Sequence, residues 1–179
     1  QPARQSESRL EVSLFCYETA PVGELLDSLA ASPHPVICHV PPGKPLAAVS
    51  AHLGSAGPWQ IGNLRVEPIA FLAQDDYDRL LWRCDINFVR GEDSFVRAQW
   101  AARPFVWQIY PQAEGAHLVK LEAFLSGHPA GAALRPFWQA WNGVGTLDWS
   151  AFANGLPALE EPLRQWTRML SEHPDLASQ

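Results

Sequence analysis

The chain has 179 residues, 47% of them hydrophobic and 18% charged, a balance that is ordinary for a globular domain and excludes a wholly disordered chain. Its formal net charge is −6, and its few basic residues are dispersed, so no basic stripe could follow a nucleic-acid backbone. No apolar run approaches the about 18 residues that a membrane span needs. We therefore expect neither a nucleic-acid partner nor a membrane.

The alternation of short apolar runs with segments of helical periodicity predicts an α/β fold with a mostly parallel sheet. Five strands are expected, at Glu11–Cys16, Val36–His39, Leu64–Ile69, Asp85–Val89 and Phe105–Ile109. Helices at 21–32, 44–53, 75–84 and 94–102 would connect them, and Asp75 or Asp76 is placed to cap the third. After the last strand we expect helices alone, at 117–127, 131–144 and Pro157–Ser171.

The cysteines and histidines give no sign of a metal centre. Cys16, Cys38 and Cys84 are far apart and include no CxxC pair, so they predict neither a disulfide framework nor a zinc site. Such cysteines fit a reducing cytoplasm. The six histidines show no HxH or HExxH spacing, and no GxSxG nucleophile elbow is present. A metal site and hydrolase chemistry are both disfavoured.

The segment RGEDS, residues 90–94, lies between a predicted strand and a predicted helix. Ligands of open α/β sheets bind outside the carboxyl ends of the strands, and a helix N-terminus there attracts anions. Gly91 would let the backbone approach a ligand, while Arg90 and Ser94 could bind phosphate oxygens. Glu92 and Asp93 would hold sugar hydroxyls or steady developing positive charge. The alternative is structural: Asp93 caps the helix and Arg90 pairs with Glu92.

Aromatic side chains accompany two other strand ends. Phe71, Gln74 and Tyr77 follow the third predicted strand, where two rings could flank a base and an amide could read its edge. Phe15 and Tyr17 lie at the end of the first strand, with side chains on one face. Each aromatic taken singly is more often a core residue, but their shared position favours a nucleotide site.

The runs SLFCYE, FLAQDDYDRLLW, CDINFVRGEDSFVRAQWAARPFVWQIYPQ and HLVKLEAFL resemble the C-terminal half of the EarP family, the protein-arginine rhamnosyltransferases of elongation factor P. The resemblance covers nearly the whole chain. It implies the GT-B glycosyltransferase architecture, in which residues 10–172 would be a Rossmann-like donor-binding domain with a helical C-terminal part. Residues 1–9 would be a leader or interdomain linker, and 173–179 a frayed tail.

By this resemblance the donor is dTDP-β-L-rhamnose, the acceptor is one arginine of elongation factor P, and the transfer is inverting and metal-independent. The resemblance places the thymine between Phe71 and Tyr77, with Gln74 on the nucleoside and Phe15 and Tyr17 bordering the donor. It assigns the ribose and diphosphate to Arg90, Asp93 and Ser94. Catalytic roles fall to Glu92, which orients the donor or the acceptor guanidinium, and to Arg90, which offsets charge on the departing dTDP.

The family's general-base aspartate belongs to an N-terminal domain with no counterpart in these residues, so we expect this chain alone to bind donor and to transfer little. Its start at Gln rather than Met is typical of a processed chain or the trailing part of a longer protein. Two alternatives stay open: the donor domain of another GT-B glycosyltransferase, and a noncatalytic nucleotide-binding module.

Overall fold

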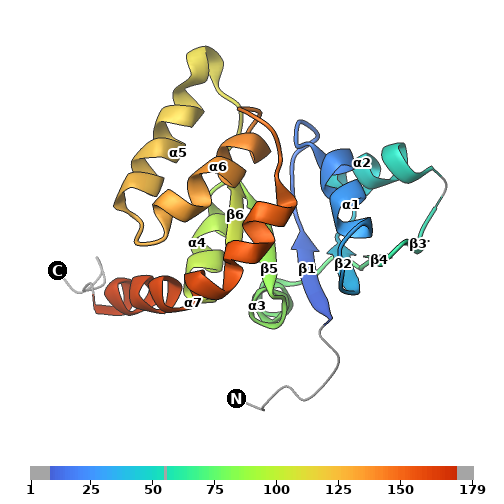
Figure 1. Cartoon of the computed structure of the whole chain (residues 1–179), viewed down its shortest axis with the longest axis horizontal. Helices are drawn as coiled ribbons and strands as arrows, with labels where there is room; N and C mark the ends of the chain where they lie inside the picture. Colours follow the sequence, from blue (N-terminus) through green and yellow to red (C-terminus); the bar gives the residue numbers. More distant parts are fainter. Residues whose placement is uncertain (1–8, 55, 173–179) are drawn as a thin grey trace.

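The computed structural model describes residues 9–54 and 56–172, and it shows one central sheet with helices packed around it (Figure 1). The predicted tail at 173–179 and all but the last residue of the predicted leader at 1–9 lie outside the described residues. The fold class is α/β, with a Rossmann-like, mostly parallel sheet flanked by helices, as the alternating pattern predicted.

The sheet has six strands in the spatial order β3-β4-β2-β1-β5-β6. Five of them are parallel and match the five predicted runs: β1 (Leu10–Leu14), β2 (Val36–Val40), β4 (Leu64–Pro68), β5 (Ile86–Arg90) and β6 (Phe105–Gln108). The sixth, β3 (Trp59–Ile61), pairs antiparallel with β4 at the edge and was not predicted from the sequence. A strand of three residues is too short to establish an alternating pattern.

Helices connect the strands and follow the last one. They are α1 (Val22–Ala30), α2 (Lys44–Leu53), α3 (Gln74–Arg83), α4 (Asp93–Trp100), the short η1 (Ala113–Gly115), α5 (Ala116–Gly127), α6 (Gly131–Trp141) and α7 (Trp149–Glu172). Because parallel crossovers are right-handed, α1 and α2 cover one face of the sheet, and α3 and α4 cover the other. The helices α5 and α6 pack together beside β6, and α7 runs from α1 past α6 to α4 (Figure 1).

Two local predictions about helices are wrong. The last helix was expected at Pro157, but α7 begins at Trp149 and contains both Pro157 and Pro162. Proline was taken as a start signal there, although the buried apolar residues Trp149 and Phe152, three residues apart, already belong to the same helix. Asp75 and Asp76 were expected to cap α3, whereas the N-cap is Ala73 and both carboxylates lie in the first turn, where they still favour the helix dipole.

The core forms between the sheet and the surrounding helices. Trp138 and Trp141, which are three residues apart in α6, are both fully buried. The Trp138 indole Nε1 donates a hydrogen bond to the Phe105 carbonyl at 2.9 Å, and the Trp141 ring lies 4.7 Å from the ring of Phe88. These contacts fix α6 against the start of β6 and the middle of β5.

Strand β1 marks the point where the chain reverses its direction across the sheet. From β1 the chain proceeds through β2 to β4, and then crosses over β1 to continue with β5 and β6. Connections on either side of such a switch point leave on opposite faces, which opens a crevice at the carboxyl ends of the strands. Within the described residues, no helix is both long and apolar enough to cross a membrane.

Candidate functional site

A cavity of about 460 Å³ opens at this crevice, above the carboxyl ends of β1, β2, β4 and β5. Its walls include residues from four separate stretches of sequence. All nine residues predicted to form the site line it: Phe15, Tyr17, Phe71, Gln74, Tyr77, Arg90, Glu92, Asp93 and Ser94. The structure thus brings the two aromatic groups and the RGEDS turn into one pocket.

Arg90 ends β5 and is held between the aromatic residues that follow β1. Its guanidinium carbon lies 4.3 Å from the centre of the Phe15 ring and 4.8 Å from that of Tyr17. One guanidinium nitrogen donates to the Cys16 carbonyl at 3.1 Å. Stacking and this hydrogen bond fix the orientation of the planar group, and its other N–H donors are available for an anion.

The turn after Arg90 has a defined shape. Gly91 adopts a positive φ of 65°, and a Cβ there would lie only 3.0 Å from the Tyr17 hydroxyl. The Trp107 indole donates to the Gly91 carbonyl at 2.6 Å, which ties the turn to β6. The buried Ser94 hydroxyl accepts from the Arg90 amide and donates to the Arg90 carbonyl. The Ser94 side chain therefore closes the turn. The backbone amide of Ser94 lies in the first turn of α4.

The structural alternative for this turn does not hold. Asp93 is the first residue of α4 rather than its cap, and Glu92 at the N-cap makes no capping hydrogen bond with its side chain. Among the described residues, Arg90 forms no ion pair with Glu92, whose side chain is exposed. The Asp93 carboxylate instead pairs with Arg97 one turn later, at 3.0 Å. Glu92 thus stands at the mouth of the pocket beside a helix N-terminus.

The predicted base platform is asymmetric. Phe71 is 87% exposed, whereas Tyr77 is largely buried and its ring packs edge-on against Phe15 at 5.9 Å. Burial raises the pKa of the Tyr77 hydroxyl, although Ser94 nearby opposes the shift. The buried hydroxyl makes no hydrogen bond of ordinary geometry with a described residue. Gln74, the exposed first residue of α3, lies between the two rings in the sequence and lines the same pocket.

Arg97 and Gln108, which were not predicted from the sequence, also line or support the pocket. Arg97 lines it and donates to both oxygens of Asp78, at 2.9 and 3.0 Å. The hydrogen bonds that Arg97 donates to Asp78, and then to Asp93, raise the pKa of Arg97. The buried Gln108 accepts from the Tyr17 amide at 2.7 Å and donates to Thr19 at 3.0 Å. Little in the sequence marks these two residues as part of a site. Gln108 is a polar residue in an apolar strand, and Arg97 follows Asp93 by one helical turn.

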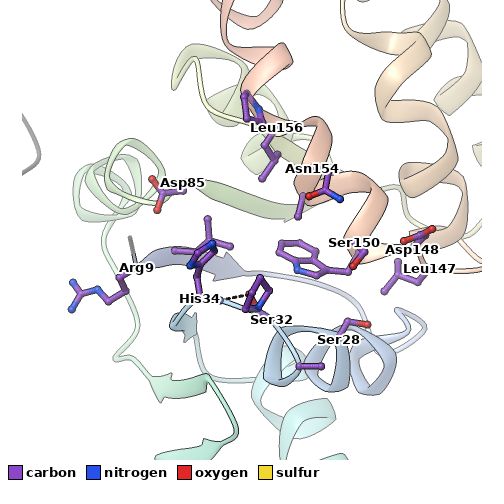
Figure 2. A pocket seen from close by; sticks show the side chains of 16 residues that line it. Arg9, Ser28, Ser32, His34, Asp85, Leu147, Asp148, Ser150, Asn154 and Leu156 are labelled. Atoms are coloured by element: carbon purple, nitrogen blue, oxygen red, sulfur yellow. Dashed lines mark hydrogen bonds between the residues drawn. The ribbon is translucent and has the colours of Figure 1, made fainter. Parts of the chain in front are cut away.

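A second cavity, of about 790 Å³, lies at the opposite, amino-terminal end of the strands. Figure 2 shows its lining side chains, which come from the start of β1, the end of α1 and the first turns of α7, among them Arg9, Ser28 and Asn154. It shares no residue with the pocket at the switch point and holds none of the predicted site residues. All the predicted site residues therefore line the smaller cavity at the switch point, and none lines this one.

A Rossmann-like domain with a pocket at the switch point of its sheet is typical of nucleotide-binding domains. The model of the family described as "Elongation-Factor P (EF-P) rhamnosyltransferase EarP" matches residues 2–179. The chain belongs to this family, as its sequence motifs indicated.

Known proteins agree with this assignment. A protein-arginine rhamnosyltransferase of Pseudomonas putida is 45% identical over 184 residues, which cover 94% of this chain and 48% of that protein. One of Pseudomonas aeruginosa is 46% identical over 180 residues, covering 93% of this chain and 48% of that protein. A solved structure that describes the structural basis for EarP-mediated arginine glycosylation of translation elongation factor EF-P superposes with a TM-score of 0.79 at 41% identity. It covers 98% of this chain and 60% of that one. The chain thus spans about half the length of the curated relatives it matches.

Proposed function

We propose that this chain is the donor-binding domain of a GT-B protein-arginine rhamnosyltransferase. Its donor would be dTDP-β-L-rhamnose, and its acceptor one arginine of elongation factor P. The single observation that supports this most is the convergence of all nine residues on one cavity at the switch point, in a chain that belongs to the EarP family. The Rossmann-like sheet agrees with this proposal. We also propose a cytoplasmic location, as expected from the cysteines.

The arrangement of the pocket suggests how the donor would lie. The thymine would enter between Phe71 and Tyr77, with Gln74 hydrogen-bonding the nucleoside, since aromatic rings and an amide suit a flat base. The diphosphate would meet the guanidinium of Arg90 and the first amides of α4, including that of Ser94, which have no partner within the helix. Asp93 would bind the ribose, and Phe15 and Tyr17 would border the donor.

The chemistry would be an inverting displacement at the anomeric carbon without a metal. An arginine nitrogen of the acceptor attacks, the bond to dTDP breaks, and the nitrogen gives up a proton. Arg90 would stabilise the negative charge that grows on the departing diphosphate, so its contribution is largest in the transition state. Glu92, exposed at the pocket mouth, would orient the donor or the acceptor guanidinium.

A guanidinium remains protonated at ordinary pH, so the attack requires a positioned carboxylate base. We assign that base to an aspartate of the N-terminal domain of the whole protein, which would face this pocket across the GT-B cleft. The chain alone should therefore bind dTDP-rhamnose and transfer little.

The test is transfer to elongation factor P, read by intact mass spectrometry. A polypeptide that carries this chain behind its N-terminal domain should add one rhamnose from dTDP-rhamnose and none from UDP- or ADP-sugars. Arg90→Ala should reduce this transfer at least tenfold, while the control Arg168→Ala, on the exposed part of α7, should not change it. Transfer from a UDP-sugar would support another GT-B enzyme, and no transfer by the complete polypeptide would support a noncatalytic module.

A further inference from the structure

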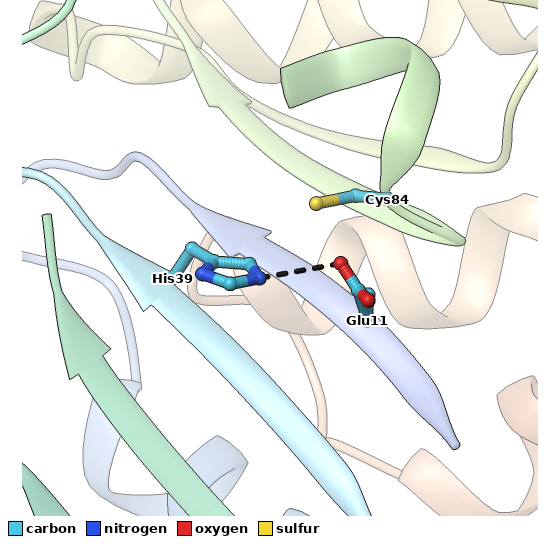
Figure 3. Close-up of side chains that lie close together, drawn as sticks. All are labelled: Glu11, His39 and Cys84. Atoms are coloured by element: carbon cyan, nitrogen blue, oxygen red, sulfur yellow. Dashed lines mark hydrogen bonds and ion pairs between the residues drawn. The ribbon is translucent and has the colours of Figure 1, made fainter. Parts of the chain in front are cut away.

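Three potential metal ligands from distant parts of the sequence meet away from the donor pocket. Glu11 in β1, His39 in β2 and Cys84 at the end of α3 each offer one ligand atom, and these atoms all lie within 4.8 Å of one another. Figure 3 shows both strand residues pointing to the sheet face on which Cys84 lies. His39 and Cys84 are almost completely buried. None of the three lines the switch-point pocket.

The sheet register creates this proximity. His39 pairs with Ser13 across the parallel strands β1 and β2, and Glu11 precedes Ser13 by two residues, so Glu11 and His39 share one face. Strand β5, which begins two residues after Cys84, is the other neighbour of β1. A site at this point would join three elements that are separate in the sequence, which is why no motif spacing predicted it.

The surrounding charges determine which histidine nitrogen carries the lone pair. The Arg83 guanidinium lies 3.2 Å from His39 Nε2, and because a guanidinium only donates, Nε2 is the acceptor in the tautomer that makes this hydrogen bond. His39 Nδ1 then carries the proton and faces the Glu67 carboxylate at 3.6 Å. Arg9 binds the Oε1 atom of Glu11 at 2.8 Å, which turns Oε2 toward His39.

Two acceptors thus lie side by side, with His39 Nε2 and Glu11 Oε2 separated by 3.4 Å. In a tetrahedral zinc site, nitrogen and oxygen ligands at their usual bond lengths are separated by about 3.3 Å. The Cys84 sulfur adds a donor that favours zinc-like ions over Mg²⁺ or Ca²⁺. A carboxylate on the second nitrogen, as Glu67 provides, is the usual partner of a metal-binding histidine.

We propose that Glu11 Oε2, His39 Nε2 and Cys84 Sγ form a binding site for Zn²⁺ or a similar thiophilic divalent ion, and that Arg83 competes with the ion for the same acceptors. On binding, the Cys84 thiol loses its proton to solvent as the metal–sulfur bond forms, and water completes the tetrahedron. The Arg83 side chain, 54% exposed and 3.2 Å from Glu11 Oε2, moves out into solvent. The ion would join β1, β2 and the start of β5 and so stabilise the sheet, apart from donor binding.

The test is titration of the whole chain with Co²⁺, an absorbing probe for zinc sites, followed by displacement with Zn²⁺. We expect a thiolate-to-cobalt absorption band that saturates at one equivalent. Cys84→Ala and His39→Gln should abolish it, whereas the matched control Cys38→Ala, a buried cysteine on the same strand as His39, should keep it. Circular dichroism verifies the fold of each variant.

Arg83→Gln provides the discriminating result, because it removes a competing cation but no ligand. It should tighten Co²⁺ and Zn²⁺ binding at least about tenfold, equivalent to ~1.4 kcal/mol. Absence of the thiolate band, its survival in Cys84→Ala, or an Arg83→Gln variant that binds no tighter would overturn the proposal. If Cys84→Ala does not fold, His39→Gln decides: loss of the band supports the site, and its survival contradicts it.

Discussion

At the scale of single residues, Arg90 connects the turn after β5 with the aromatic residues after β1. It was predicted from its place between a strand and a helix, and the structure adds why its position is fixed: two rings and one carbonyl hold the guanidinium. The sequence could indicate the residue types at each strand end because parallel strands end at a common edge. It could not indicate the side-chain pairings, since Arg97 with Asp78, and Gln108 with Tyr17, depend on packing between distant segments.

Gly91 provides a test of the turn. Gly91→Ala would place a side chain at a φ of 65° and within 3.0 Å of the Tyr17 hydroxyl, so we expect a loss of about 1–2 kcal/mol in the free energy of unfolding. Binding of dTDP should weaken as well, because Tyr17 and the turn both line the pocket.

Gly155→Ala is the matched control, measured by the same urea denaturation. Gly155 lies inside α7, where an added Cβ meets nothing within 4 Å, so alanine should leave stability unchanged or raise it by roughly 0.5–1 kcal/mol. Equal effects of the two substitutions would contradict the strain assigned to the Gly91 turn.

At the scale of elements, the regular crossovers were predictable and the irregular parts were not. The four connecting helices were recognised because each has an apolar face of helical period. Strand β3 was missed because three residues at a sheet edge carry little pattern, and α7 was cut short because its internal prolines resemble helix boundaries. Both misses lie outside the switch-point pocket, so the site prediction did not depend on them.

The junction of α5 with α6 and α7 contains a buried histidine with a measurable consequence. His128 packs between the rings of Phe124 and Trp166, at 5.3 and 4.8 Å, and its Nδ1 accepts the Ala130 amide at 3.1 Å. Burial lowers the pKa of His128 from 6.5 to about 4. The neutral imidazole is therefore the form that the folded protein accommodates.

This shift makes stability depend on pH. The contribution of His128 is complete above pH 6.5, and it is lost as pH falls from about 6.5 to about 4, because the unfolded chain binds the proton first. The loss should approach about 3 kcal/mol. His128→Asn keeps an acceptor for Ala130 and should flatten this part of the unfolding profile. The control His117→Asn, at a histidine that accepts the Gln112 amide in the same way, should retain the wild-type slope. An unchanged slope in His128→Asn would contradict this assignment.

At the scale of the whole molecule, the chain corresponds to about half of its relatives, and the pocket faces outward from the carboxyl edge of the sheet. Of its four proposed aromatic walls, only Phe71 is strongly exposed, while Phe15, Tyr17 and Tyr77 shield one another or stack with Arg90. These contacts preorganise the site within one domain, which favours donor binding by the chain alone.

The most direct test of the donor site is calorimetric titration of this chain with dTDP, with UDP and ADP as competing nucleotides. We predict saturable binding that prefers dTDP, and at least a tenfold increase in Kd for Arg90→Ala, because hydrogen bonds to a charged group contribute about 1.5–3 kcal/mol. Gln74→Ala should reduce the preference for dTDP. Binding with no preference among the three nucleotides, or unchanged by Arg90→Ala in a folded protein, would contradict the assignment of this pocket to the donor.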